Sequence, residues 1–148
     1  MERYEKPGRT ERIFNLIFGI LVARGLGLPH NVLLEVRGRN TGRRYATPVD
    51  LLIVDERRYL VAPRGHTQWV RNALASGTVT LRRGRWSERF RVRALSPEET
   101  PPILRAYLDR FRRTVQRYFP VPAGSPAETF RPLVGHYPAF ELVPDQKR

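Results

Sequence analysis

Along residues 31–143, apolar and polar side chains alternate with a period of two in several short runs, a pattern typical of half-buried β-strands. The run 85–95 shows this most plainly, because Trp86 and Phe90 fall on one face and four arginines on the other. Pro48 interrupts the second run and predicts an edge strand or a bulge, because proline cannot donate to a β-ladder. The predicted strands cover residues 31–37, 43–54, 59–62, 78–82, 85–95 and 137–143.

Two stretches with helical spacing predict helices between these strands. The first covers residues 67–76 and is followed by Gly77, a residue that favours a helix C-terminus. The second covers residues 97–118 and follows a capping box formed by Ser96 and Glu99. Its apolar stripe consists of Leu104, Tyr107, Leu108, Phe111 and Val115.

Residues 1–28 are predicted to form a polar tail and an apolar helix. Residues 13–23 of this helix are apolar nearly all round but too few to cross a bilayer. Their surface must be covered by the domain, by a second subunit in a homodimer, or by weak contact with a membrane surface. No small-residue cleavage site follows, so we expect a retained helix in a cytoplasmic protein, with peripheral attachment at the inner membrane face as the alternative.

The order of elements is helix, three strands, short helix, two strands, helix and strand. A chain of 148 residues suits a single domain, 1–148. Six strands that mostly follow one another as hairpins favour a small antiparallel barrel over residues 31–143, because closure removes exposed sheet edges. The predicted class is therefore mainly β with flanking helices.

The chain is strongly basic, with 27 Lys and Arg against 14 Asp and Glu and a net charge of +13. Only Lys6 and Lys147 are lysines, so the positive charge is almost all on arginine, which suits phosphate and carboxylate ligands. Nucleic acid is a less favoured partner, because Trp86 and Phe90 alternate away from the arginines of their strand. The absence of Cys and the wide spacing of three His argue against a metal site.

Motifs of common hydrolases are missing from the chain. It contains no G-x-S-x-G, Walker or H-E-x-x-H sequence. Asp50 and Glu88 are the acids to consider as a pair, and no spacing places them together. An acid–base hydrolase is therefore poorly supported.

Two segments could hold a flat, anionic ligand. Residues 37–44 form an arginine-rich turn bracketed by Gly38 and Gly42, whose backbone amides and guanidinium groups suit a phosphate, although a solvated basic turn gives the same pattern. Residues 62–72 lead from a strand into a helix N-terminus, a common place for anions and cofactors. Trp69 in this segment either packs on a flat ring or belongs to the core.

These two segments resemble those of the deazaflavin-dependent nitroreductase family. The resemblance rests on LEVRGRNTG at 34–42 with Pro48 after it, VAPRG at 61–65 and QW-x-x-N at 68–72, and it covers residues 31–95. It implies a split β-barrel of the FMN-binding and pyridoxamine-phosphate-oxidase-like kind and an oxidoreductase that uses coenzyme F-420. The alternative is an FMN- or haem-binding barrel or a cofactor carrier.

The resemblance also implies the residues that bind the cofactor. Arg39, Asn40 and Thr41 would hold its phosphate and acidic tail, assisted by Arg43 and Arg44 because Asn40 replaces a lysine common in the family. The ring would lie between the second and third strands and the short helix, in one crevice shared with the turn. The implied set is Arg39, Asn40, Thr41, Arg43, Arg44, Tyr45, Ala46, Thr47, Pro48, Val49, Val61, Ala62, Pro63, Arg64, Gln68, Trp69 and Asn72.

The implied reaction is hydride transfer from a reduced deazaflavin to a small electron-poor acceptor such as a quinone, an enone or a nitro compound. The cofactor carries this step, so no protein nucleophile is needed. Tyr45 and Tyr137 are the candidate proton donors. Members of the family often cover the substrate with tyrosines from the C-terminal part, and here Phe119, Phe130 and Tyr137 are the predicted substrate pocket.

Overall fold

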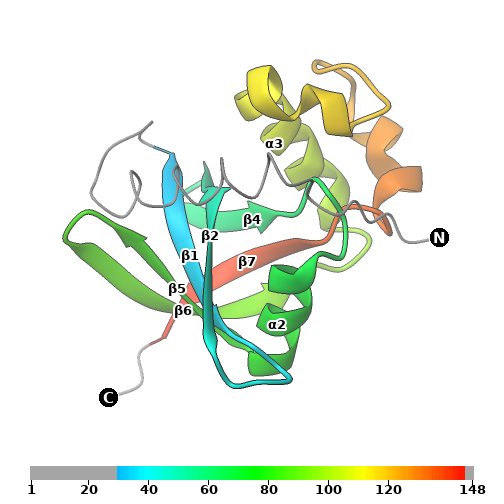
Figure 1. Cartoon of the computed structure of the whole chain (residues 1–148). Helices are drawn as coiled ribbons and strands as arrows, with labels where there is room; N and C mark the ends of the chain where they lie inside the picture. Colours follow the sequence, from blue (N-terminus) through cyan, green and yellow to red (C-terminus); the bar gives the residue numbers. More distant parts are fainter. Residues whose placement is uncertain (1–29, 146–148) are drawn as a thin grey trace.

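A computed structural model describes residues 30–145 and contains one seven-stranded antiparallel sheet (Figure 1). The strand order is β2-β1-β5-β6-β7-β4-β3, and β2 also approaches β4, so the sheet curls into a barrel. The strands are β1 Asn31–Arg37, β2 Arg44–Asp50, β3 Leu52–Val54, β4 Arg57–Val61, β5 Thr78–Arg83, β6 Trp86–Ala94 and β7 Ala139–Pro144. The helices are α2 Gln68–Ser76 and α3 Thr100–Val115, with 3-10 turns η1 Gln116–Tyr118 and η2 Ala127–Leu133.

The two edges of the sheet come from neighbouring parts of the chain. The second predicted strand is in fact two strands, because β2 pairs with β1 while β3 pairs with β4 at the opposite edge. The break falls at Leu51, whose N–H donates to the His30 carbonyl (2.9 Å), and not at Pro48. Pro48 lies opposite Leu33 within β2, an edge strand as predicted, where its missing N–H removes little from the ladder.

Both predicted helices are present with modified ends. Helix α2 ends at Gly77, which adopts φ 79° and donates its N–H to the Ala73 carbonyl, as predicted from a glycine at this position. Ser96 and Glu99 form the predicted capping box, in which each backbone N–H donates to the other side chain. The regular helix begins at Thr100 and gives way after Val115 to η1, so residues 97–118 are not one continuous helix.

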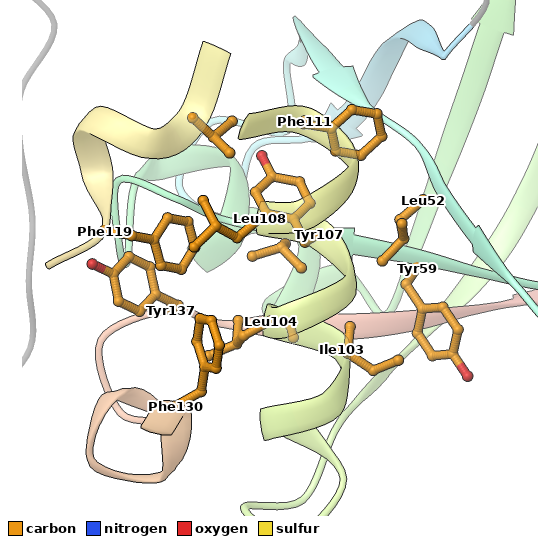
Figure 2. Close-up of a cluster of buried hydrophobic side chains, with 13 residues drawn as sticks. Leu52, Tyr59, Ile103, Leu104, Tyr107, Leu108, Phe111, Phe119, Phe130 and Tyr137 are labelled. Atoms are coloured by element: carbon orange, nitrogen blue, oxygen red, sulfur yellow. The ribbon is translucent and has the colours of Figure 1, made fainter. Parts of the chain in front are cut away.

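Three clusters of buried hydrophobic residues lie within residues 30–145, and the two larger ones form the main cores. One fills the barrel and contains Leu34, Leu60, Leu81, Phe90 and Leu142. The other lies between the sheet and α3, which with the 3-10 turns gathers at one end of the barrel (Figure 1), and its side chains are drawn in Figure 2. The predicted stripe of α3 supplies much of this second core, since its residues 104, 107, 108, 111 and 115 are all buried.

Some predictions concern residues that the structure does not describe, and others are modified by the structure. The tail and apolar helix of residues 1–28 lie outside, and with them the suggested contact of residues 13–23 with a subunit or a membrane. Within residues 30–145, no helix is long and apolar enough to span a membrane. Trp86 lies next to the β5–β6 turn with 38% of its surface exposed, whereas Phe90 of the same face is buried.

Candidate functional site

A cleft of about 580 Å³ opens between the barrel, α2 and the end of α3. Its size suits a cofactor or a small-molecule ligand. Three parts of the chain line it: the segment from the end of β1 through the turn into β2, the segment from β4 into α2, and four residues of α3 and η1. The lining residues are Val36, Gly38, Arg39, Asn40, Thr41, Tyr45, Ala46, Thr47, Pro48, Val49, Asp50, Val61, Ala62, Pro63, Arg64, Thr67, Gln68, Trp69, Asn72, Tyr107, Thr114, Val115 and Tyr118.

The glycine-bracketed turn forms one end of the cleft and is closed by its own backbone. The Gly38 N–H donates to the Arg43 carbonyl (2.6 Å), and the Gly42 N–H donates to the Gly38 carbonyl (3.0 Å). Gly42 adopts φ 73°, a conformation that glycine tolerates at no steric cost. A Cβ on Gly38 would lie 2.5 Å from Cε2 of Tyr45, so glycine is required here for the Tyr45 ring to cover the turn.

Arg39 connects this turn to helix α2. The Asn72 Oδ1 accepts two hydrogen bonds, from the Arg39 backbone N–H (3.0 Å) and from its guanidinium Nη1 (2.7 Å). Asn72 is 5% exposed, so its side chain is a buried support of the turn. The structure therefore places Arg39 and Trp69 in one crevice, as the sequence predicted, and gives Asn72 a positioning role.

Two of the predicted arginines lie outside the cleft. Arg43 and Arg44 are absent from its lining, whereas the neighbouring Thr41 and Tyr45 belong to it. The Arg44 guanidinium lies 3.8 Å from the Glu35 carboxylate, which also pairs with Arg82 of β5 (3.1 Å).

The segment after β4 forms the second wall. Trp69 packs on both the barrel core and Phe140, whose ring centroid is 6.0 Å away, and it also lines the cleft, where a ligand ring could meet it. The resemblance implied backbone amides from residues 61–64 for the ring. The Ala62 N–H already donates to the Pro138 carbonyl (2.8 Å) and Pro63 has no N–H, so neither residue can donate a backbone hydrogen bond to the ring.

Thr67 supplies a polar atom that the protein itself leaves unsatisfied. It is the N-cap residue of α2, makes no side-chain capping bond, and lines the cleft. Its hydroxyl is buried and has no hydrogen-bond partner among residues 30–145. A buried hydroxyl without a partner costs free energy, and a ligand seated at this helix N-terminus would satisfy it. The cleft thus fits an anionic or polar group at this point.

Asp50 and His30 form a pair that sequence spacing did not predict. The His30 Nδ1 lies 3.0 Å from the Asp50 Oδ1, and the Asn31 amide donates to the same oxygen (2.7 Å). Burial raises the pKa of Asp50, an effect that His30 and Asn31 partly oppose. Glu88, considered earlier as a partner of Asp50, is not among the residues that line the cleft. Only the antiparallel register of β1 and β2 brings residues 20 positions apart into contact.

The C-terminal residues predicted for the substrate pocket are in the core instead. Phe119 and Tyr137 stack with centroids 4.3 Å apart, and Phe130 is fully buried beside them (Figure 2). The Tyr137 hydroxyl donates to the Tyr118 carbonyl, so Tyr137 is neither a pocket residue nor an accessible proton donor. Tyr45, the other candidate donor, lines the cleft and is 45% exposed.

The third wall of the cleft comes from α3 and η1, and no pattern in the sequence indicated it. Its members are Tyr107, Thr114, Val115 and Tyr118. Tyr107 and Val115 were predicted as members of the buried stripe of the helix, and they are indeed buried. A stripe that packs on a core can also border a cavity, and the helical period alone does not separate the two cases.

The model of the F420H(2)-dependent quinone reductase family matches residues 14–119. This chain belongs to that family. Members of the family are oxidoreductases that use a reduced deazaflavin, so the match agrees with the resemblance carried by the turn and by the segment after β4. No curated protein sequence matches the chain.

Solved structures show which fold this family member has. A protein described as a domain-swapped dimer shares 18% identity, with a TM-score of 0.56 over 90% of this chain and 93% of that one. An F420-H2 dependent reductase shares 17% identity, with a TM-score of 0.53 over 77% and 94%. A FAD-binding protein from Mesorhizobium loti shares 12% identity, with a TM-score of 0.51 over 88% and 89%. The fold is therefore the split β-barrel of flavin-binding and pyridoxamine-oxidase-like proteins.

Proposed function

We propose that the cleft binds reduced coenzyme F-420 and that the protein transfers a hydride from it to a small quinone, enone or nitro compound. The observation that carries this proposal is the pair of hydrogen bonds from Arg39 to Asn72, which joins the basic turn and α2 into one cleft. Membership of the family supports the deazaflavin over FMN as the cofactor.

The tail of the cofactor would bind at the turn. Arg39, Asn40 and Thr41 line this end of the cleft and offer a guanidinium, an amide and a hydroxyl to its phosphate and carboxylates. Thr67 at the N-terminus of α2 offers a further hydroxyl and the positive end of a helix dipole. The net charge of +13 would favour capture of such an acidic ligand.

The ring of the cofactor would lie between Pro48 of β2 and Trp69 of α2, which both line the cleft. When bound in its reduced form, the deazaflavin supplies a hydride. The acceptor would occupy the part lined by Tyr107, Thr114 and Tyr118, which combines aromatic surface with hydroxyl groups. Such a wall suits a flat, electron-poor ring, and it would shield the reacting atoms from water.

A direct test is a titration of the purified protein with coenzyme F-420 and, separately, with FMN, followed by the fluorescence of each compound at low salt. We expect saturable binding of the deazaflavin, and oxidation of its reduced form when menadione or a nitroaromatic compound is added. Saturable binding of FMN alone would favour the flavin-binding alternative. Absence of any saturable change with the deazaflavin would overturn the proposal.

We also propose that the protein forms a homodimer, on the ground that a similar structure is described as a domain-swapped dimer. Light scattering coupled to size-exclusion chromatography tests this directly. We expect a mass near twice the 17.2 kDa of one chain, and a mass of one chain at micromolar concentration would contradict it.

A further inference from the structure

A carboxyl group and an imidazole meet at the wall of the cleft, and neither takes part in binding the cofactor or in the hydride transfer proposed above. Asp50 is the last residue of β2 and lines the cleft, with 18% of its side chain exposed. Its Oδ1 lies 3.0 Å from the His30 Nδ1 and accepts a hydrogen bond from the Asn31 amide (2.7 Å). The pair is thus fixed by residues at the start of β1, opposite the end of β2.

The surroundings of Asp50 favour its protonated form. Burial is the largest influence and raises the pKa of this carboxyl, while the charge of His30 and the hydrogen bonds from His30 and Asn31 lower it. Tyr107 faces the same cleft from α3, and its pKa is raised well above the usual value, first by burial and then by the Asp50 charge. Asp50 can therefore hold a proton at a higher pH than an ordinary aspartate.

Arginines occur on elements beside the pair, and none of them is among the groups that shift the pKa of Asp50. Arg83 donates to the Asn31 carbonyl (2.5 Å), and the Arg110 guanidinium lies 5.6 Å from the centre of the Phe111 ring. Arg64 lines the same cleft as Asp50. The charge that lowers the pKa of Asp50 is therefore that of His30.

His30 is placed to exchange protons with solvent. Its ring packs on Phe111 of α3 with centroids 4.6 Å apart, which fixes its orientation. Its side chain is 16% exposed, so one part of the ring faces Asp50 while another reaches water. Imidazole changes its protonation near neutral pH more readily than other side chains and commonly serves as a proton shuttle.

We propose that Asp50 donates the proton that the acceptor takes up together with the hydride, and that His30 restores this proton from solvent. The proposal rests on the proposed function and deepens it. The acceptor gains two electrons and one hydrogen as the hydride and becomes an anion. The O–H bond of the Asp50 carboxyl then breaks as an O–H bond forms on the product. The Asp50 carboxylate regains a proton from protonated His30, which takes one from water.

The pair could instead only tie β1 to β2. Asp50→Asn separates the two roles, because it keeps the side-chain volume and an oxygen for the Asn31 amide but cannot donate an acidic proton. The matched control is Glu35→Gln, which removes a carboxylate from β1 that pairs with Arg82 (3.1 Å) and does not line the cleft. His30→Gln tests the relay, because it removes the group that lowers the pKa of Asp50.

Three measurements on the full-length protein test the proton role of Asp50. The first is the affinity for F-420, followed by fluorescence. The second is the single-turnover rate at which menadione oxidises reduced F-420 from pH 4 to 9, and the third is the carboxyl ¹³C resonance of Asp50 in the ligand-free protein. We expect Asp50→Asn to bind the cofactor within about twofold of wild type and to transfer the hydride about 100-fold more slowly, the usual effect of a lost general acid. In wild type we expect the single-turnover rate to fall as the pH rises. The midpoint of this fall should equal the pH midpoint at which the Asp50 carboxyl resonance shifts. In His30→Gln both midpoints move to higher pH.

The outcomes separate this proposal from the function on which it rests. If wild type does not bind the cofactor, the proposed function fails and the proton role fails with it. If wild type binds and reacts while Asp50→Asn matches Glu35→Gln in rate and pH profile, only the proton role is wrong. If Asp50→Asn does not fold, the wild-type comparison still decides, because a rate midpoint that differs from the Asp50 resonance midpoint overturns the proposal.

Discussion

Asn72 holds Arg39 by two hydrogen bonds, and this contact decides where one cation of the ligand site points. Arg39→Ala removes a guanidinium that would meet the cofactor phosphate. We expect affinity for coenzyme F-420 to fall by about 1.5–3 kcal/mol, roughly 10- to 100-fold, because a charge-assisted hydrogen bond is lost. Fluorescence titration of the variant with coenzyme F-420 measures this loss of affinity. Arg91→Ala is the control, since it removes the same charge from an exposed position on β6 outside the cleft. Equal loss in the two variants would contradict a specific contact.

Gly38 lacks a side chain, and this leaves room for the Tyr45 ring beside the turn. In Gly38→Ala the added Cβ would lie 2.5 Å from the Tyr45 ring, which must move away from the turn. We expect cofactor affinity to fall by about 1 kcal/mol with little change in Tm, because Tyr45 is exposed and can rotate. In a Tyr45→Ala background the substitution at 38 has a smaller effect on binding, because only the contact with the Thr41 hydroxyl (3.0 Å) remains. Gly135→Ala, which meets no atom within 4 Å, is the control.

At the scale of elements, an ionic network fixes the start of α3 to the sheet. Arg93 of β6 donates to Glu99 (2.9 Å) and to Glu141 of β7 (2.8 Å), and Glu99 also closes the capping box with Ser96. The network therefore anchors the start of the helix that carries one wall of the cleft.

The network makes a prediction about acid stability. Hydrogen bonds from Arg93, then from the Ser96 backbone, lower the pKa of Glu99 from 4.5 to about 2. A pKa lowered in the folded state gives stability that is present above pH 4.5 and lost as the pH falls towards 2. Glu99→Gln should therefore have a lower Tm than wild type at pH 7, and the difference should close between pH 4.5 and 2. Thermal unfolding followed by circular dichroism tests this, with the neighbouring exposed Glu98→Gln as control. A difference in Tm that persists at pH 2 would argue against the ionic contribution.

At the scale of the whole molecule, the excess of 27 Lys and Arg over 14 Asp and Glu predicts a salt-sensitive affinity for an acidic cofactor. We expect the dissociation constant of coenzyme F-420 to rise steeply between 50 and 500 mM NaCl. The deazaflavin head group without its phosphate and glutamate tail should show a much weaker dependence. Parallel titrations of the two compounds make this comparison. Equal salt dependence of both would show that the charge acts without contacting the tail.

The sequence by itself determined the local parts of this protein. Alternating residues predicted most strands, Gly77 predicted the end of α2, and Ser96 and Glu99 predicted the cap of α3, because these features depend on neighbours within a few residues. It also gave a basic turn at 37–44, along with the motifs that resemble the family.

Only the tertiary structure decided which of these parts meet. Arg39 reaches Asn72 across 33 residues, and His30 reaches Asp50 through strand register, contacts that no local spacing encodes. The same is true of the cleft wall from α3 and of Phe130, whose place in the core depends on how η2 packs against that helix. The sequence determines which side chains are present, but the distances between residues far apart in sequence arise only when the sheet closes and the helices pack on it.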